Sequence, residues 1–150
     1  MIGAIIGDIV GSRFEVGAAP QEGFELFTPD CSYTDDTVCT VAVADAVLNG
    51  RSYQESLLDW CRRYPDPMGG YGNRFNRWIH SEHPQPMDSF GNGAAMRVSP
   101  IGWLFDEWED VLEEAKKSAI VSHNHPEGVK GAQCIAETIC WLRLMRFPKS

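Results

Sequence analysis

The stretch YTDDTVCTVAVA, residues 33–44, places two adjacent carboxylates directly before a long apolar run. Asp35 and Asp36 stand between two threonine hydroxyls, and the apolar residues that follow are typical of a buried helix. Asn49-Gly50 then gives a common signal for the end of a helix. We therefore predict a core helix that carries a block of negative charge in its first turn.

Two explanations fit this charged helix start. Acidic and hydroxyl side chains are favoured at helix N-termini, because they cap free amides and interact well with the helix dipole. A cap needs one acceptor, however, and residues 34–37 offer four. Adjacent carboxylates repel each other unless a cation or strong donors offset their charge. Their oxygens suit Mg²⁺ or Mn²⁺, whereas zinc favours histidine and cysteine. Capping and metal binding both remain open at this point.

Composition predicts one soluble globular domain over residues 1–150. The chain is 43% hydrophobic and 23% charged, with a formal net charge of −8. This acidic balance argues against a general binder of nucleic acids or anionic membranes. No apolar run approaches the roughly 18 residues that span a bilayer. The five cysteines form no CxxC motif and no basic leader precedes the first apolar segment, so we expect reduced thiols in a cytoplasmic protein.

The first segment predicts a short apolar helix from Met1 to about Phe14. Its three glycines each cost about 1 kcal/mol in a helix interior, which favours close approach by another backbone. Asp8 and Glu15 are seven residues apart and so share one face of this helix. They are either ordinary exposed acids or point at the same cation as the carboxylates of the core helix.

The remaining chain predicts further helices joined by loops, with no convincing strand. Two capping boxes are expected, one at residues 52–55 and one at residues 106–109. Pro100 is expected to bend or break a helix that begins at Gly93, and Pro148 to stop the last helix. The pattern therefore predicts an all-α domain, with helices that begin near Ser52, Arg74, Gly93, Asp106 and Pro126.

Two further stretches contain candidate ligand-binding residues. Gly91-Asn92-Gly93 predicts a tight turn into a helix N-terminus, where free amides bind anions and small residues let a ligand approach the backbone. A simple turn explains the same glycines. Pro126 suits the first position of a helix, with Asn124 or His125 as its cap. The alternative is that His123 and His125 donate hydrogen bonds to a substrate. His80 and His83 have no clear ligand spacing and are interpreted as surface residues.

Taken in order, four stretches resemble the ADP-ribosylglycohydrolase family, which includes the dinitrogenase-reductase-activating glycohydrolases. They are spread over nearly the whole chain, and four motifs in the family's order are far more specific than one. The matching pieces are GAIIGDIVG at 3–11 with Glu15, YTDDT at 33–37, GNGAAMR at 91–97 with SPIG at 99–102, and SHNHPEG at 122–128.

The resemblance implies a compact all-α fold of helices packed orthogonally and a pair of Mg²⁺ or Mn²⁺ ions. It implies hydrolysis of the glycosidic bond between ADP-ribose and an acceptor on a protein or small molecule. Arginine, serine, a nucleobase or an ester all remain open as the acceptor. Carried over by position, the metal ligands would be Thr34, Asp35 and Asp36, the catalytic residues Glu15 and Asp36, and the substrate-binding residues Gly91, Asn92, Gly93 and His123.

One departure from the family is the absence of its second metal motif. Family members are usually longer, and their C-terminal half brings an Asp-x-Asp motif followed by serine or threonine, which residues 1–150 lack. The chain therefore resembles the N-terminal half of the family fold, truncated at the C-terminus. Its last helix is heavily apolar, which predicts self-association or a complementing C-terminal chain. The alternative is a catalytically inactive relative that only binds ADP-ribose or has a structural role.

Overall fold

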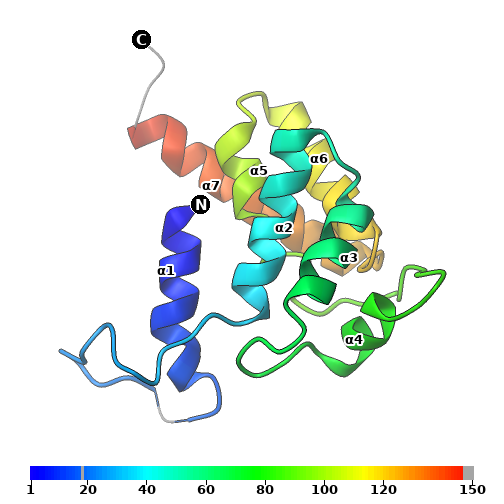
Figure 1. Ribbon diagram of the computed structural model, residues 1–150. Helices are drawn as coiled ribbons and strands as arrows, with labels where there is room; N and C mark the ends of the chain where they lie inside the picture. The colour runs from blue at the N-terminus through cyan, green and yellow to red at the C-terminus, as the bar shows by residue number, and fades with distance from the viewer. Residues whose placement is uncertain (18, 147–150) are drawn as a thin grey trace.

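The computed structural model describes residues 1–17 and 19–146, and this part of the chain is helical without a strand (Figure 1). One isolated parallel bridge joins Thr34 to Met68. The predicted all-α class is confirmed, while the predicted helix stop at Pro148 lies outside the described residues. The helices are α1 (Ile2–Gly11), the 3₁₀ helix η1 (Ser12–Phe14), α2 (Asp35–Asn49), α3 (Tyr53–Arg63), α4 (Asn73–Ile79), α5 (Ser99–Leu104), α6 (Trp108–Ile120) and α7 (Pro126–Arg146).

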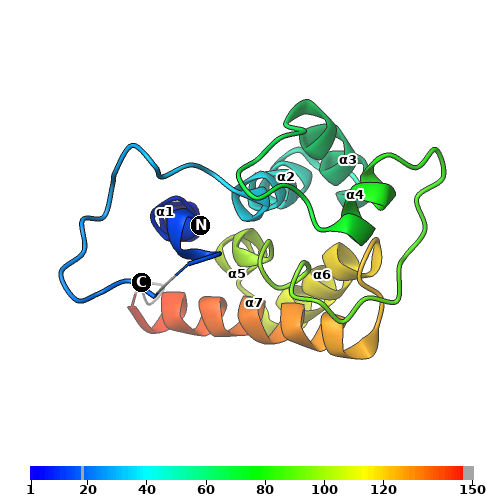
Figure 2. The same ribbon diagram turned by 90° about the horizontal axis from the view of Figure 1, so that it is seen from below.

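The helices form layers around α2. Figure 2 shows α7 running along one side of the molecule, with α5 and α6 packed against it. Helices α2 and α3 pack together on the opposite side of α5, and α4 contacts α3. Helix α1 stands beside α2 at the edge of the molecule. Residues 15–17 and 19–34, between η1 and α2, contain no helix.

Helix α2 contributes to both hydrophobic clusters of the core. Val43 packs in one cluster with residues of α5, α6 and α7, and Cys39 packs in the other with residues of α3 and α4. The apolar run that follows the paired carboxylates is thus buried as predicted. Phe75 and Trp78 are also buried in this second cluster, and their stacked rings have centroids 5.3 Å apart.

The ends of α2 follow the sequence signals. Thr34 is extended, and its hydroxyl accepts a hydrogen bond from the Asp36 amide at 3.1 Å. Gly50 ends the helix in the left-handed conformation at φ 62°, which glycine adopts without strain. Ser52 caps α3 by accepting from the Glu55 amide, so this predicted cap is confirmed.

Two other predicted helix starts are wrong. Residues 92–97 form successive turns, and α5 begins only at Ser99, with Pro100 in its first turn. Proline suits that position because its missing amide hydrogen has no helical partner there, so Pro100 helps to start a helix rather than to break one. The capping box at Asp106 does not form either, since α6 begins at Trp108 without a side-chain cap and Asp106 instead pairs with Arg143 at 2.7 Å.

Helix α1 packs less closely than the sequence predicts. None of its residues is buried, although most of them are apolar. A Cβ atom added at Gly3, Gly7 or Gly11 would meet no atom within 4 Å, so the predicted close approach of another backbone is wrong for the described chain. One face of α1 is therefore left without a packing partner among residues 1–17 and 19–146.

The five cysteines are all free. Cys39 and Cys61 are buried between α2 and α3 with their sulfur atoms 3.9 Å apart. Within the described chain, every helix is too short or too polar to cross a membrane.

Candidate active site

The first turn of α2 is fixed by a carboxylate from α1. Asp8 accepts hydrogen bonds from the hydroxyl and amide of Thr34 at 2.6 and 2.9 Å, and from the hydroxyl and amide of Thr37 at 2.5 and 3.2 Å. Four donors on one carboxylate satisfy free amides at the helix start and stabilise its negative charge. Asp8 therefore caps α2 from 26 residues away and sets the position of Asp35 and Asp36.

Thr34 has a structural role that limits what it offers to a metal ion. Its side chain is fully buried, and its hydroxyl donates to Asp8 while accepting from the Asp36 amide. A hydroxyl oxygen has two lone pairs, so one lone pair is left for a further interaction. Of the predicted ligands, Asp35 and Asp36 are thus less committed to the fold than Thr34.

The structure brings the predicted acids together. Met68 donates its amide hydrogen to the Tyr33 carbonyl at 3.1 Å, which draws the turn after Pro67 against the start of α2. In the same turn, Gly69 has a φ of 79°, and a Cβ there would lie 3.3 Å from a Glu15 carboxylate oxygen. This turn and the start of α2 therefore lie beside Glu15, which follows η1, at a shared and partly exposed acidic site.

We call the carboxylates of Asp8, Glu15, Asp35 and Asp36 the acidic cluster. Burial, Asp36 and Glu15, in that order, raise the pKa of Asp35 to about 6. Burial and then the charges of Asp8 and Glu15 also raise the pKa of Asp36. None of the ion pairs within the described chain includes a member of this cluster. A cation bound beside these groups would relieve their repulsion.

The donor chemistry fits a hard divalent cation, but the ligand set is only part of a site. Carboxylate oxygens are the ligands that Mg²⁺ and Mn²⁺ prefer. Among the residues that the structure describes, no group of three or more acidic, histidine or cysteine side chains is arranged to hold a metal ion. The acidic cluster can therefore supply some ligands of a metal centre, while others must come from water, substrate or another polypeptide segment.

The second predicted site lies where the loop over residues 88–97 meets the start of α7. The Asp88 amide donates to the Asn124 side chain at 2.7 Å, and Phe90 contacts the His125 ring edge-on at 5.4 Å. Gly128 lets α7 approach the Ser89 carbonyl, because a Cβ there would lie 2.7 Å from that oxygen. Of the two alternatives for His125, capping is observed, since its ring nitrogen accepts from the Glu127 amide at 3.2 Å.

His123 lies directly against this loop. Its ring is buried, and a Cβ added to Gly93 would lie 2.6 Å from Nε2 and 2.7 Å from Cε1. Burial, together with the positive charges of Arg97 and Arg74, lowers the pKa of His123 to about 4. The imidazole is therefore neutral at physiological pH and can donate from one ring nitrogen only.

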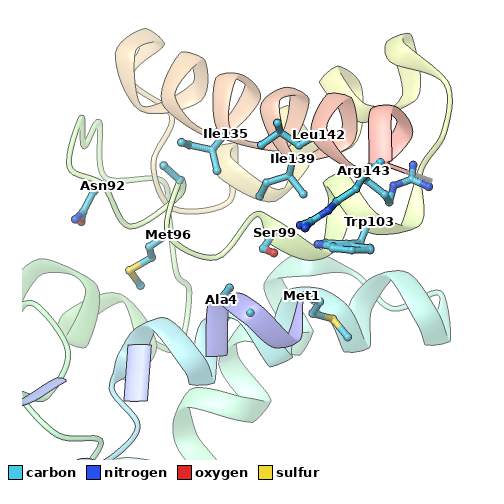
Figure 3. A pocket seen from close by; sticks show the side chains of 13 residues that line it. Met1, Ala4, Asn92, Met96, Ser99, Trp103, Ile135, Ile139, Leu142 and Arg143 are labelled. Carbon is cyan, nitrogen blue, oxygen red and sulfur yellow. The ribbon is translucent and has the colours of Figure 1, made fainter. Parts of the chain in front are cut away.

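Asn92 lines a groove of about 630 Å³ between α1, α5 and α7, and His123 is not among the lining residues (Figure 3). The groove is largely apolar, with Arg143 near one end. Met1 and Ala4 form the α1 side, opposite residues of α7. Its lining residues are Met1, Gly3, Ala4, Asn92, Ala95, Met96, Ser99, Trp103, Ile135, Ile139, Leu142, Arg143 and Arg146.

Comparison with known families accounts for this combination of an acidic cluster, a glycine loop and a neighbouring histidine. The family described as ADP-ribosylglycohydrolase matches residues 1–147. The chain belongs to the ADP-ribosylglycohydrolase family. The resemblance carried by the four sequence stretches is thus confirmed, and the match includes every residue of the acidic cluster and of the loop.

Similar proteins include ADP-ribosylhydrolase ARH3 from several vertebrates. The Xenopus tropicalis protein is 27% identical over 88% of this chain and 46% of its own length. The Danio rerio protein is 28% identical over 99% of this chain and 48% of its own length. The Homo sapiens protein is 27% identical over 88% of this chain and 46% of its own length. The chain therefore spans slightly less than half the length of these relatives.

Several contacts of the site have no clear counterpart in the sequence patterns. Asp8 was a candidate acid, but its role as the distant cap of α2 depends on a turn of the chain that spacing does not reveal. Gly69 approaches Glu15 across an even longer separation. Arg97 belongs to one of the four family-like stretches, and the structure buries it fully beside His123. A charged residue among alanine, methionine and valine was the available sign of that burial.

Proposed function

We propose that this chain provides the N-terminal half of a metal-dependent ADP-ribosyl hydrolase, which cleaves the glycosidic bond between ADP-ribose and an acceptor. The observation that carries the proposal is the acidic cluster, in which Asp8 locks the first turn of α2 while the neighbouring carboxylates have no basic partner in the described chain. Family membership gives this cluster its chemical context.

The carboxylates have separate tasks in this proposal. Asp35 and Asp36, with one lone pair of Thr34, would hold Mg²⁺ or Mn²⁺, which orients and polarises water and hydroxyl groups when bound. Glu15 is exposed and accepts a hydrogen bond from the attacking water. Cleavage of a glycosidic bond develops positive charge on the sugar, so the negative potential of the acidic cluster stabilises the transition state.

The loop over residues 91–93 and His123 would hold the ADP-ribose moiety. Gly91 is exposed and lets a ligand approach the backbone. Gly93 instead makes room for the His123 ring, whose neutral imidazole offers a hydrogen-bond donor without an added charge. The substrate is then an ADP-ribosylated protein or a small ADP-ribose conjugate. We place this reaction in the cytoplasm, where the five free thiols stay reduced.

We further propose that the groove between α1, α5 and α7 binds a polypeptide that corresponds to the remaining half of the longer relatives. Helix α1 has no buried residue, and Leu142 and Met145 of α7 are 61% and 73% exposed. Covering this apolar surface would complete the packing of α1 and hold Asp8 in place. Such a segment also provides a source for the missing metal ligands.

The hydrolysis assay uses the purified chain and peptides that carry ADP-ribose on serine or on arginine. Each peptide is incubated with Mg²⁺, with Mn²⁺ or with EDTA, and free ADP-ribose is measured by mass spectrometry. The same reactions are repeated with the C-terminal half of the Xenopus tropicalis relative added in trans. We expect metal-dependent release, which is faster when the second polypeptide is present.

The outcomes separate the proposals. Release that EDTA does not reduce contradicts metal dependence. No release by the chain alone or by the chain with the second polypeptide contradicts hydrolysis. Binding of ADP-ribose without release in any mixture would point to the alternative, a protein that only binds ADP-ribose. Sedimentation of the chain alone and of the mixture tests the groove, and Leu142→Glu should prevent the complex, whereas Leu48→Glu, on the exposed end of α2, should not.

A further inference from the structure

We propose that Arg97 and Ser122 form a relay of hydrogen bonds that fixes the proton of His123 on Nε2, and that this nitrogen donates to an acceptor atom of a ligand at the loop over residues 91–93. Arg97 and Ser122 are positioning residues in this inference, since they act through His123. The ligand part rests on the proposed function, whereas the position of the proton does not.

The relay begins at a buried cation. The Arg97 side chain is 0% exposed, and its Nη2 donates to the Ser118 carbonyl at 2.7 Å and to the Ser122 hydroxyl at 2.8 Å. Its Nε and Nη1 atoms have no partner in the described chain, and its guanidinium lies over the Phe75 ring at 5.8 Å. A buried guanidinium with so few partners is costly, which indicates a role beyond packing.

The hydrogen bonds have a direction, because Arg97 can donate but cannot accept. Ser122 Oγ therefore accepts from Arg97 and has its own hydrogen left to donate. Ser122 Oγ lies 2.9 Å from Nδ1 of His123. Within the described residues, Nδ1 is the acceptor found for the Ser122 hydroxyl hydrogen. Nδ1 thus accepts, and in a neutral imidazole the hydrogen must then be on Nε2.

The protonated nitrogen faces the glycine loop. The position of a Cβ on Gly93 would be 2.6 Å from Nε2, so this edge of the ring lies against the loop backbone. No group in the described chain accepts a hydrogen bond from Nε2. Two cations, Arg97 and Arg74, also oppose protonation of the ring, so His123 stays a neutral donor. A ligand oxygen or nitrogen that reaches Nε2 would accept this hydrogen bond.

The test determines the tautomer directly. Protein labelled with ¹⁵N at histidine is studied by long-range proton–nitrogen NMR near neutral pH, and the His123 signals are assigned by their loss in His123→Gln. We expect the hydrogen on Nε2 in the unmodified chain. Ser122→Ala should shift the His123 nitrogen resonances toward a mixture of tautomers, and Ser122→Thr should restore them because it keeps the hydroxyl.

Ser118→Ala is the matched control. It removes the same hydroxyl from another fully buried serine, whose Oγ donates to the Ala115 carbonyl instead of His123. This variant should leave the His123 tautomer unchanged. A hydrogen on Nδ1 in the unmodified chain, or no change in Ser122→Ala, would overturn the relay.

Ligand binding is measured separately with ADP-ribose. We expect affinity to fall about tenfold in Ser122→Ala and to recover in Ser122→Thr, as for the loss of one oriented hydrogen bond. If the tautomers behave as expected but neither the unmodified chain nor the two Ser122 variants bind ADP-ribose, the relay stands and the proposed function fails. If ADP-ribose binds equally to all three proteins, the role of the relay in recognition is contradicted.

Discussion

The acidic cluster and the Arg97–Ser122–His123 relay are two charged regions with opposite sign and opposite surroundings. The acidic cluster is anchored by donors to Asp8, but its other carboxylates repel one another and are partly accessible. The three side chains of the relay are buried. Arg97 donates hydrogen bonds to the Ser118 carbonyl and the Ser122 hydroxyl. Burial favours the uncharged form in both regions, since it raises the pKa of Asp35 and lowers that of His123.

The difference shows how each region can be completed. The relay already has a directed set of hydrogen bonds, so a ligand needs only to accept from His123. The acidic cluster lacks positive charge in the described chain, so a cation would change its energetics strongly. In the proposed function, recognition therefore belongs to the relay side and metal binding to the acidic side.

The largest expected effect comes from removing a carboxylate of the acidic cluster. Asp36→Ala should lower the rate of ADP-ribose release about a thousandfold, which corresponds to about 4 kcal/mol in the barrier. Asp66→Ala, in the exposed loop after α3, is the control and should keep the rate. An unchanged rate for Asp36→Ala in the hydrolysis assay would remove the assigned role of Asp36.

The next effect concerns the pH dependence of the relay side. The folded pKa of His123 is about 4, below the ordinary value of 6.5, so the folded protein binds fewer protons than the unfolded chain between these values. Its contribution to stability is fully present above pH 6.5 and is lost as the pH falls toward 4, by about 3 kcal/mol. Urea unfolding at pH 7 and pH 4 should show this loss reduced in His123→Gln. Equal pH dependence of the two proteins would contradict a buried neutral imidazole.

A steric change tests how tightly the relay side is closed. Gly93→Ala should lower the free energy of unfolding by about 2 kcal/mol, because the new methyl group would overlap the His123 ring. At Gly91 the nearest atom to an added Cβ is the Ser89 hydroxyl at 3.4 Å, so Gly91→Ala should cost less than about 0.5 kcal/mol. Urea denaturation measures both, and equal costs would show that His123 is not held against the loop.

The smallest effect is a gain in stability on the acidic side. The pKa of Asp35 is raised from 3.8 to about 6, so its ionisation costs stability as the pH rises through this range. In EDTA at pH 7, Asp35→Asn should therefore be about 1 kcal/mol more stable than the unmodified chain, after allowance for partial exposure. The gain should vanish below pH 4. A loss of stability at pH 7 would mean that Asp35 is already balanced by partners within the chain.

Local signals in the sequence were enough for the helical class and for several helix ends. Thr34, Ser52 and Gly50 act through neighbours in the chain, so their roles can be seen from spacing alone. The start of α5 was not predicted because Gly91 and Gly93 weaken helix formation, and the first helical turn forms around Pro100 instead. The glycines of α1 were interpreted as contact positions, yet the described chain packs nothing against them.

The candidate site was only partly predictable, because its key contacts join distant parts of the chain. The acids were selected from their types and spacing, and the structure gathers them through Asp8 and the turn at Gly69. His123 and Gly93 were selected as members of separate motifs, and their contact depends on tertiary packing. No local pattern indicated that Arg97 reaches Ser122, which lies 25 residues further along the chain.

Calorimetric titration with Mn²⁺ alone tests the central claim most directly, namely that the acidic cluster is a cation site. The titration compares the unmodified chain with the double variant Asp35→Asn, Asp36→Asn at pH 6. The account predicts binding to the unmodified chain with release of protons, because bound metal displaces the proton that Asp35 partly holds at this pH. The double variant should show neither. Equal binding by both proteins, or no binding to the unmodified chain at millimolar metal, would contradict the account.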